Sequence, residues 1–268
     1  MKRYALILAA VLLAAPQVRV FAGQPDENKL FTPAFFKRGW GDLKELPTKP
    51  FHWEKKEWFI AGGVLGASLT AIAFDGKVQT YYRDHRSGFF TSVSDVTTHF
   101  GDYKQQVPIL MGTWIAGLAT GNETLNKIAA DGAEASIIAA GIITPTLVYC
   151  TGRALPNANE DPQKFRPFVP MRYSYPSGHT TAAFSLATVL DQDLREKFGY
   201  WHTPIVYGMA VGTATSRIYD DTHYLSDVIL GAGIGWSVGY WISNKPRNKD
   251  RTVWIIPTTD GVMLTAKF

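Results

Sequence analysis

The chain of 268 residues has 27 basic and 23 acidic side chains, a net charge of +4 and a hydrophobic share of 46%. This length fits one large domain with appendages, and a sizeable core is within reach. The basic residues are scattered rather than clustered, which argues against nucleic acid as a partner. With a single cysteine, Cys150, the chain has no internal disulfide and no cysteine-based metal site.

The first residues have the pattern of a secretory signal peptide. Two basic residues precede an apolar stretch, residues 4–15, and small residues up to Ala22 provide a cleavage site. We expect a signal peptide over residues 1–22, and therefore an exported protein of the periplasm or the inner membrane. The alternative is an uncleaved N-terminal anchor, although the apolar stretch is shorter than the roughly 20 residues of a spanning helix.

The remainder predicts a lead-in segment followed by a helical domain. Residues 23–56 are polar and interrupted by prolines, which predicts loops or short helices packed over the main domain. Over residues 57–245, apolar runs without charged side chains alternate with polar connectors, so the predicted fold is all-α, a six-helix bundle. The runs are 58–74, 105–122, 135–152, 180–190, 203–216 and 228–244.

The composition of these runs leaves two modes of membrane association open. Glycines recur in the first and last runs and predict close helix packing. They are Gly62, Gly63, Gly66, Gly231, Gly233 and Gly235. Most runs fall short of a bilayer span and the mean hydropathy is −0.06, so we expect a membrane partner but keep integral and peripheral association as alternatives.

The C-terminal tail, residues 246–268, has a different pattern. Residues 252–257 and 262–268 alternate in polarity around a polar turn. This pattern predicts a short β-hairpin.

The first candidate for a functional site is the segment from Tyr175 to His179, a predicted turn directly before an apolar run. A helix start presents unpaired N–H groups and a partial positive charge, so Ser177, Gly178 and His179 lie where an anion would bind. Plain helix capping by Ser177 is the alternative.

A second group of polar residues follows the run that ends at Ser216. His223 and Asp227 are four residues apart, a spacing that places two side chains on one face of a helix. A carboxylate there holds an imidazole in one tautomer, as a nucleophilic histidine requires, although a solvated surface pair has the same spacing. The guanidinium of Arg217 offers a planar fork that suits phosphate oxygens.

Together these residues resemble two of the three signatures of the type 2 phosphatidic acid phosphatase and vanadium haloperoxidase superfamily. They are Pro-Ser-Gly-His at 176–179, then Ser216-Arg217, five residues, His223, three residues and Asp227. The resemblance covers roughly residues 58–244 and implies a helical phosphatase domain. It implies hydrolysis of a phosphomonoester or pyrophosphate, of a phosphorylated lipid or small phosphoester, without a metal or other cofactor.

The resemblance also implies a role for each matching residue. His223 would be the nucleophile that forms a phosphohistidine, Asp227 its orienting partner, and His179 the acid that protonates the leaving oxygen. Arg217, Ser177 and the backbone N–H of Gly178 would hold the phosphoryl oxygens.

The first signature of the family, a lysine, six residues and Arg-Pro, is incomplete. Val148 and Leu155 stand where the lysine and the arginine are expected. Arg153 is the first candidate for a replacement phosphate contact. Further candidates are Lys164, Arg166 and Arg172. The loss leaves two alternatives, a protein that binds phosphate or lipid headgroups without turnover and, less compatible with the missing cations, a vanadium haloperoxidase.

Overall fold

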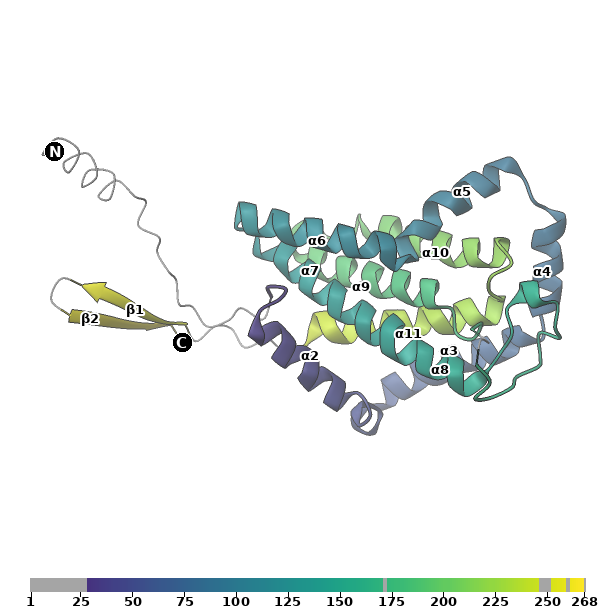
Figure 1. Ribbon diagram of the computed structural model, residues 1–268, viewed down its shortest axis with the longest axis horizontal. Coiled ribbons are helices and arrows are strands. Elements are labelled where there is room, and N and C mark those ends of the chain that lie inside the picture. The colour runs from purple at the N-terminus through teal and green to yellow at the C-terminus, as the bar shows by residue number, and fades with distance from the viewer. Residues whose placement is uncertain (1–27, 171–172, 246–251, 259–260, 268) are drawn as a thin grey trace, which may run out of the picture. The chain divides into compact units, whose positions relative to one another are not determined.

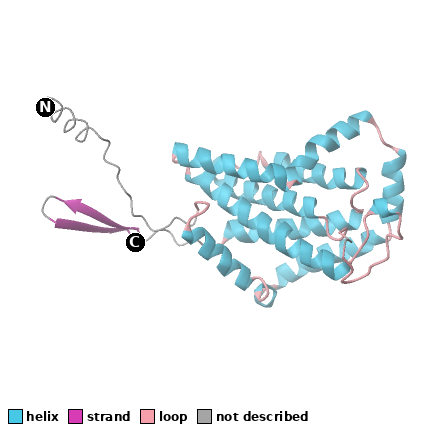
Figure 2. Cartoon of the chain, viewed as in Figure 1, coloured by secondary structure: helices cyan, strands magenta, loops and turns pink. Residues whose placement is uncertain are grey.

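The computed structural model describes residues 28–170, 173–245, 252–258 and 261–267. The chain divides into two compact units, one of residues 27–247 and one that combines residues 1–26 with 248–268. The expected signal peptide lies outside the described residues. Helices make up nearly all of the first unit (Figure 2), which confirms the predicted all-α class.

All six predicted apolar runs fall on helices, but the described residues contain further helices. The α-helices are α2 (Pro33–Glu45), α3 (Lys55–Ile72), α4 (Asp75–Asp84), α5 (Gly88–Thr98), α6 (Tyr103–Thr120), α7 (Glu123–Ser136), α8 (Thr144–Thr151), α9 (Gly178–Phe198), α10 (Thr203–Tyr219) and α11 (Leu225–Asn244). The predicted count of six leaves out α4 and α5, because charged and hydroxyl side chains interrupt their apolar pattern, whereas α2 lies in the lead-in segment, where short helices are expected. In α5 two hydroxyls bond within the helix, since Thr91 and Ser92 donate to the carbonyl oxygens four residues before them.

The run predicted at 135–152 is the second half of a longer helix. α7, a π-helical segment (Ile137–Ile143) and α8 follow one another without interruption over 29 residues. The sequence did not predict the first half of this helix, α7, because acidic residues interrupt its apolar pattern. One of them, Glu134, is buried and pairs with Arg38 of α2 at 2.5 Å, which allows the helix to continue through the core.

α9 lies in the middle of the helical unit, among α7, α10 and α11 (Figure 1). It approaches α11 closely because α11 presents glycines: a Cβ added to Gly235 would lie 2.3 Å from the carbonyl oxygen of Thr181. Gly231 and Gly239, four residues to either side, are also in close contact with the α9 backbone. The predicted close approach is therefore confirmed for α11, whereas a Cβ added to Gly62, Gly63 or Gly66 of α3 would meet no atom of another element within 4 Å.

Apolar side chains complete this packing. One buried cluster joins the α7 region, α9 and α11, and consists of Ala135, Ile138, Ala139, Val189, Val238 and Ile242. Burying each of the larger aliphatic side chains contributes roughly 1.5–3 kcal/mol. The cluster fixes α9 and α11, whose N-terminal ends carry the candidate site.

The lead-in segment contains α2, which starts with two favourable features. Thr32 caps the helix by accepting a hydrogen bond from the N–H of Phe35 at 3.1 Å, and Pro33 occupies the first turn. Lys245, directly after α11, forms ion pairs with Asp42 and with Glu45, the latter at 3.1 Å. These contacts tie α2 to the end of α11.

The second unit contains two described strands, β1 (Thr252–Thr258) and β2 (Gly261–Lys267). They pair antiparallel, with Thr252 opposite Lys267 and Thr258 opposite Gly261.

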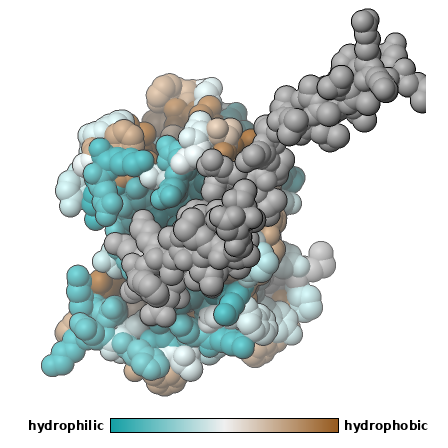
Figure 3. Space-filling view, turned by 90° about the vertical axis from the view of Figure 1, so that its left-hand side faces the viewer, coloured by the Kyte–Doolittle hydropathy of each residue, from teal (hydrophilic) through white to brown (hydrophobic). Residues whose placement is uncertain are grey.

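The surface of the helical unit carries many exposed apolar side chains. Among the described residues, one helix, Glu123–Thr151, is long and apolar enough to cross a membrane, and α3 with α4 passes the same test only as a pair bent by 65°. Large exposed side chains include Trp40, Trp58, Phe59, Phe89, Phe90 and Trp201. On the face drawn in Figure 3, hydrophobic patches lie beside hydrophilic ones.

Candidate active site

The first part of the site is the N-terminus of α9. Ser177 is fully buried and caps the helix, accepting from the backbone N–H of Thr180 at 3.4 Å and from its hydroxyl at 3.0 Å. Gly178 and His179, the first two residues of the helix, are partly exposed. The side chain of Ser177 thus has the capping role that was the alternative interpretation. It engages one first-turn N–H group, that of Thr180, at a helix start whose partial positive charge suits an anion.

The second part is the turn between α10 and α11, which carries His223. The carbonyl oxygen of Arg217 accepts from the N–H groups of Thr222 at 3.1 Å and His223 at 3.0 Å, so the turn is pinned to the last turn of α10. Nδ1 of His223 lies 2.8 Å from the carbonyl oxygen of Ser174. A carbonyl oxygen only accepts, so Nδ1 carries the proton and Nε2 keeps its lone pair.

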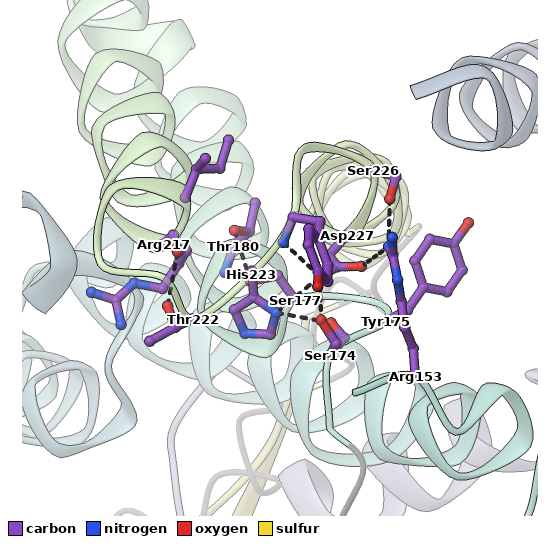
Figure 4. Close-up of polar contacts among 12 residues, drawn as sticks. Arg153, Ser174, Tyr175, Ser177, Thr180, Arg217, Thr222, His223, Ser226 and Asp227 are labelled. Atoms are coloured by element: carbon purple, nitrogen blue, oxygen red, sulfur yellow. Dashed lines mark hydrogen bonds and ion pairs between the residues drawn. The ribbon is translucent and has the colours of Figure 1, made fainter. Parts of the chain in front are cut away.

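Asp227 lies next to the imidazole of His223, but the two residues are not on one helix. His223 precedes α11, so the two side chains do not share a helix face, and the nearest carboxylate oxygen is 3.5 Å from Nδ1. That oxygen accepts from the N–H of Tyr224 at 2.8 Å and from the hydroxyl of Ser174 at 2.5 Å. Asp227 therefore holds the turn and Ser174, and Ser174 orients the imidazole (Figure 4).

His179, His223 and Arg217 act on one another electrostatically. Burial, followed by the neighbouring Arg217 and His223, lowers the pKa of His179 to about 4, against a smaller opposing effect of Asp102. At neutral pH the His179 imidazole is therefore neutral in the free protein. Residues that are distant in the sequence thus interact in one region, and its guanidinium, Arg217, is suited to an anion.

Arg217 is held in place by acidic neighbours. Its guanidinium pairs with Asp220 at 2.7 Å, and Ser94 of α5 donates to the same carboxylate at 3.1 Å. Burial lowers the pKa of Arg217, while Asp220 and Asp102 oppose that effect. Figure 4 shows Arg217 on one side of His223 and the Ser174–Asp227 pair on the other.

Residues 133–251 match the model of the PAP2 superfamily. The chain carries a PAP2 superfamily domain. The match includes the turn at Ser177 and the residues from Arg217 to Asp227, the same segments that the geometry brings together.

Proteins that resemble the chain include two curated relatives and a solved structure. Lipid A 1-phosphatase of Porphyromonas gingivalis is 25% identical over 260 residues, 91% of this chain and 52% of that protein. Lipid A 4'-phosphatase of the same organism is 34% identical over 71 residues, 26% of this chain and 29% of that protein. The chain thus spans about half the length of the first relative. The transmembrane PAP2 type phosphatidylglycerolphosphate phosphatase of Bacillus subtilis shares the fold, with a TM-score of 0.50, 17% identity and coverage of 69% of this chain and 94% of that one.

Arg153 of the incomplete first PAP2 signature does not reach the phosphate side of the site. Its side chain is fully buried, and its guanidinium donates to Asp75 and Asp227, both at 2.6 Å. Gly152, which ends α8 with φ of 59°, allows the loop to pass here, since a Cβ would lie 1.7 Å from the carbonyl oxygen of Arg166. The structure therefore corrects the interpretation of Arg153 as a phosphate contact.

The other substituted positions of the PAP2 signature bring no cation either. Val148 is buried in α8, and Leu155 caps a short 3-10 turn. Lys164 and Arg166 are exposed, and the guanidinium of Arg166 lies 3.7 Å from the carboxylate of Glu160. Arg172 lies outside the described residues.

Sequence reasoning missed Ser174, Asp75 and Asp102. Ser174 gave no signal, since its contribution to His223 is a backbone carbonyl. Asp75 did give one, because it is an isolated carboxylate directly after a long apolar run. Among the residues that the structure describes, no group of three His, Cys, Asp or Glu side chains is arranged to hold a metal ion.

Proposed function

We propose that this protein is a phosphatase that hydrolyses a phosphomonoester or pyrophosphate of a lipid, through a phosphohistidine at His223. The observation that carries the proposal is the hydrogen bond from Nδ1 of His223 to the carbonyl oxygen of Ser174, which leaves Nε2 as a nucleophile beside Arg217 and His179. The PAP2 domain and the similarity to lipid A 1-phosphatase support the reaction class.

The reaction takes place in two steps. Nε2 of His223 attacks phosphorus, the bond to the leaving oxygen breaks, and His179 gives that oxygen a proton. A water molecule then attacks the phosphohistidine, His179 takes a proton from it, and inorganic phosphate leaves. Arg217 and the first-turn N–H groups at Gly178 stabilise the charge on the phosphoryl oxygens.

Substrate binding favours protonation of His179. In the free protein the pKa of His179 is about 4, because burial and the neighbouring Arg217 and His223 disfavour the imidazolium. A phosphate dianion brings negative charge next to all three groups, which favours the imidazolium and raises that pKa. The acid therefore forms together with the complex.

A lipid substrate also fits the surface. The helical unit exposes large apolar side chains such as Trp58, Phe59 and Phe89, and one of its helices has the length and composition of a membrane span. We infer association with a membrane, and, from the signal-peptide pattern of residues 1–22, an active site on the periplasmic side.

Phosphate release from the full chain tests the proposal. Lipid phosphomonoesters, lipid pyrophosphates and an aryl phosphate are offered in detergent micelles, and inorganic phosphate is measured. We expect release from a lipid substrate, inhibition by vanadate and no release with His223→Ala. A wild-type protein that releases phosphate from none of these compounds contradicts the proposal.

A binding protein without turnover is the second candidate. It is favoured by the missing cations at Val148 and Leu155 and by the engagement of Arg153 with Asp75 and Asp227. Phosphate-analogue binding that is lost in Arg217→Ala, without release of phosphate by the wild type, identifies this function.

A further inference from the structure

A buried ion pair links two helices behind the candidate nucleophile. Arg153 lies between Asp75 at the start of α4 and Asp227 in the first turn of α11, with a distance of 2.6 Å to each carboxylate. All three side chains are fully excluded from solvent. Burying one cation between two anions is costly unless the geometry is closely fixed, so the arrangement requires rigid surroundings.

Asp75 connects this ion pair to the N-terminus of α11. One of its carboxylate oxygens accepts from the backbone N–H of Ser226 at 2.9 Å, and the other accepts from the Ser226 hydroxyl at 2.5 Å. First-turn N–H groups lack partners within their own helix, and a carboxylate there is favoured by the helix dipole. Asp75 thus caps α11 from a different helix.

The remaining surface of the Arg153 guanidinium is covered. The ring of Tyr224 lies 4.2 Å from the guanidinium carbon, and the rings of Phe165 and Tyr175 lie at 5.2 and 5.9 Å. The carbonyl oxygen of Pro162 accepts from Nε at 2.8 Å. A guanidinium with its donors and faces engaged in this way is not available to a phosphate.

Two routes lead from Arg153 to the imidazole of His223. Through its side chain, Arg153 holds Asp227, which accepts from the Ser174 hydroxyl. Through its main chain, the carbonyl oxygen of Arg153 accepts from the N–H of Ser174 at 3.2 Å. Ser174 then accepts from Nδ1 of His223.

We propose that Arg153 and Asp75 are positioning residues, whose buried pair fixes Asp227 and Ser174 and thereby the imidazole of His223, without contacting the phosphate. This inference rests on the proposed phosphatase function. The arginine that the sequence suggested as a phosphate contact serves the nucleophile instead. Its removal therefore affects the chemical step more than substrate binding.

Steady-state kinetics of the full chain separate these roles. For Asp75→Asn and Arg153→Lys we expect kcat to fall about 10- to 100-fold with KM within about twofold, because an interaction that matters only in the transition state is lost. Asp84→Asn, an exposed carboxylate at the other end of α4, is the matched control and keeps wild-type kinetics. A KM raised about tenfold at unchanged kcat in Arg153→Lys would identify a phosphate contact and overturn the inference.

Nitrogen NMR of the histidine side chains supplies a readout that needs no turnover. In the wild type the His223 ring is expected as the Nδ1–H tautomer with a hydrogen-bonded proton, and this signal should be lost in Asp75→Asn. If the wild type releases no phosphate but the NMR change occurs, the proposed function fails and the positioning role stands. If phosphate is released while neither kcat nor the signal changes, the positioning role fails.

A milder variant covers the case in which a charge substitution prevents folding. Ser226→Ala keeps both charges and removes the hydroxyl that donates to Asp75 and accepts from Arg153 at 2.6 Å. We expect kcat to fall about threefold to tenfold with KM unchanged, and circular dichroism confirms the helical fold. A folded Ser226→Ala protein with wild-type kcat and an unchanged His223 signal also contradicts the inference.

Discussion

The carbonyl oxygen of Ser174 accepts a hydrogen bond from Nδ1 of His223 at 2.8 Å, across 49 residues of sequence. This contact decides which ring nitrogen can act, because the proton on Nδ1 leaves the lone pair on Nε2. The reactive nitrogen of the candidate nucleophile is therefore defined by a backbone atom, and the side-chain motifs alone do not reveal which nitrogen it is.

The first prediction concerns this nucleophile. His223→Gln keeps a polar side chain but removes the nucleophilic nitrogen, so phosphate release should fall by at least about 1,000-fold. Alkaline-quenched labelling with a radioactive phosphoryl donor checks the mechanism, since wild type should carry a label that is stable to base and released by acid, and His223→Gln should carry none. A labelled His223→Gln protein would place the covalent intermediate on another residue.

The second prediction concerns the pH dependence of stability. The pKa of His179 is about 4 in the folded protein and 6.5 in the unfolded chain, so the unfolded state binds more protons between these values. The stabilisation is fully present above pH 6.5 and is lost as the pH falls towards 4, by up to about 3 kcal/mol. Urea unfolding at several pH values should therefore show a flatter profile for His179→Gln than for wild type. Parallel profiles for wild type and His179→Gln would show that His179 is solvated.

The third prediction concerns the incomplete PAP2 signature. Leu155 stands at the expected arginine position and is half-buried, and a charge-assisted contact to a phosphoryl group is worth roughly 2–4 kcal/mol in the transition state. Leu155→Arg should therefore raise kcat/KM for phosphate release at least about tenfold, whereas Leu155→Met should not. A fall in activity with Leu155→Arg would show instead that this side chain contacts an apolar part of the substrate.

The fourth prediction concerns the contact between α9 and α11. A Cβ on Gly235 would lie 2.3 Å from the carbonyl oxygen of Thr181, so Gly235→Ala forces the helices apart and should destabilise the fold by about 1–3 kcal/mol. Gly208 of α10 has no atom within 4 Å of such a Cβ, and Gly208→Ala should be neutral or stabilising by up to about 1 kcal/mol. Thermal unfolding followed by circular dichroism compares the two, and equal melting temperatures would contradict the packing argument.

The sequence was sufficient to predict the class of the fold, because long apolar runs without charges exist only where a helix is buried or faces an apolar medium. It was insufficient for α4, where Asp75 and Arg83 interrupt the pattern, and for α7, where acidic residues are buried because α2 brings Arg38 to meet one of them. Such pairs are tertiary contacts, which local periodicity does not contain.

For the site, the motif letters identified the segments but not the partners. His179 interacts electrostatically with Arg217 and His223, and their joint role at a phosphate stays a prediction. The spacing of His223 and Asp227 suggested a direct pair on one helix, yet the helix begins only at Leu225. The engagement of Arg153 depends on Asp75, 78 residues away in the chain, and no pattern in the sequence joins them.

The glycines of α11 have a consequence for how the site works. Because α9 and α11 lie backbone against backbone, the N-terminus that presents Gly178 and the turn that presents His223 belong to one rigid block. The distance between Nε2 of His223 and the N–H groups at the start of α9 is thus set during folding, before any ligand binds. Substitutions in the other helices can therefore change which substrates bind without changing the relative positions of Gly178 and His223.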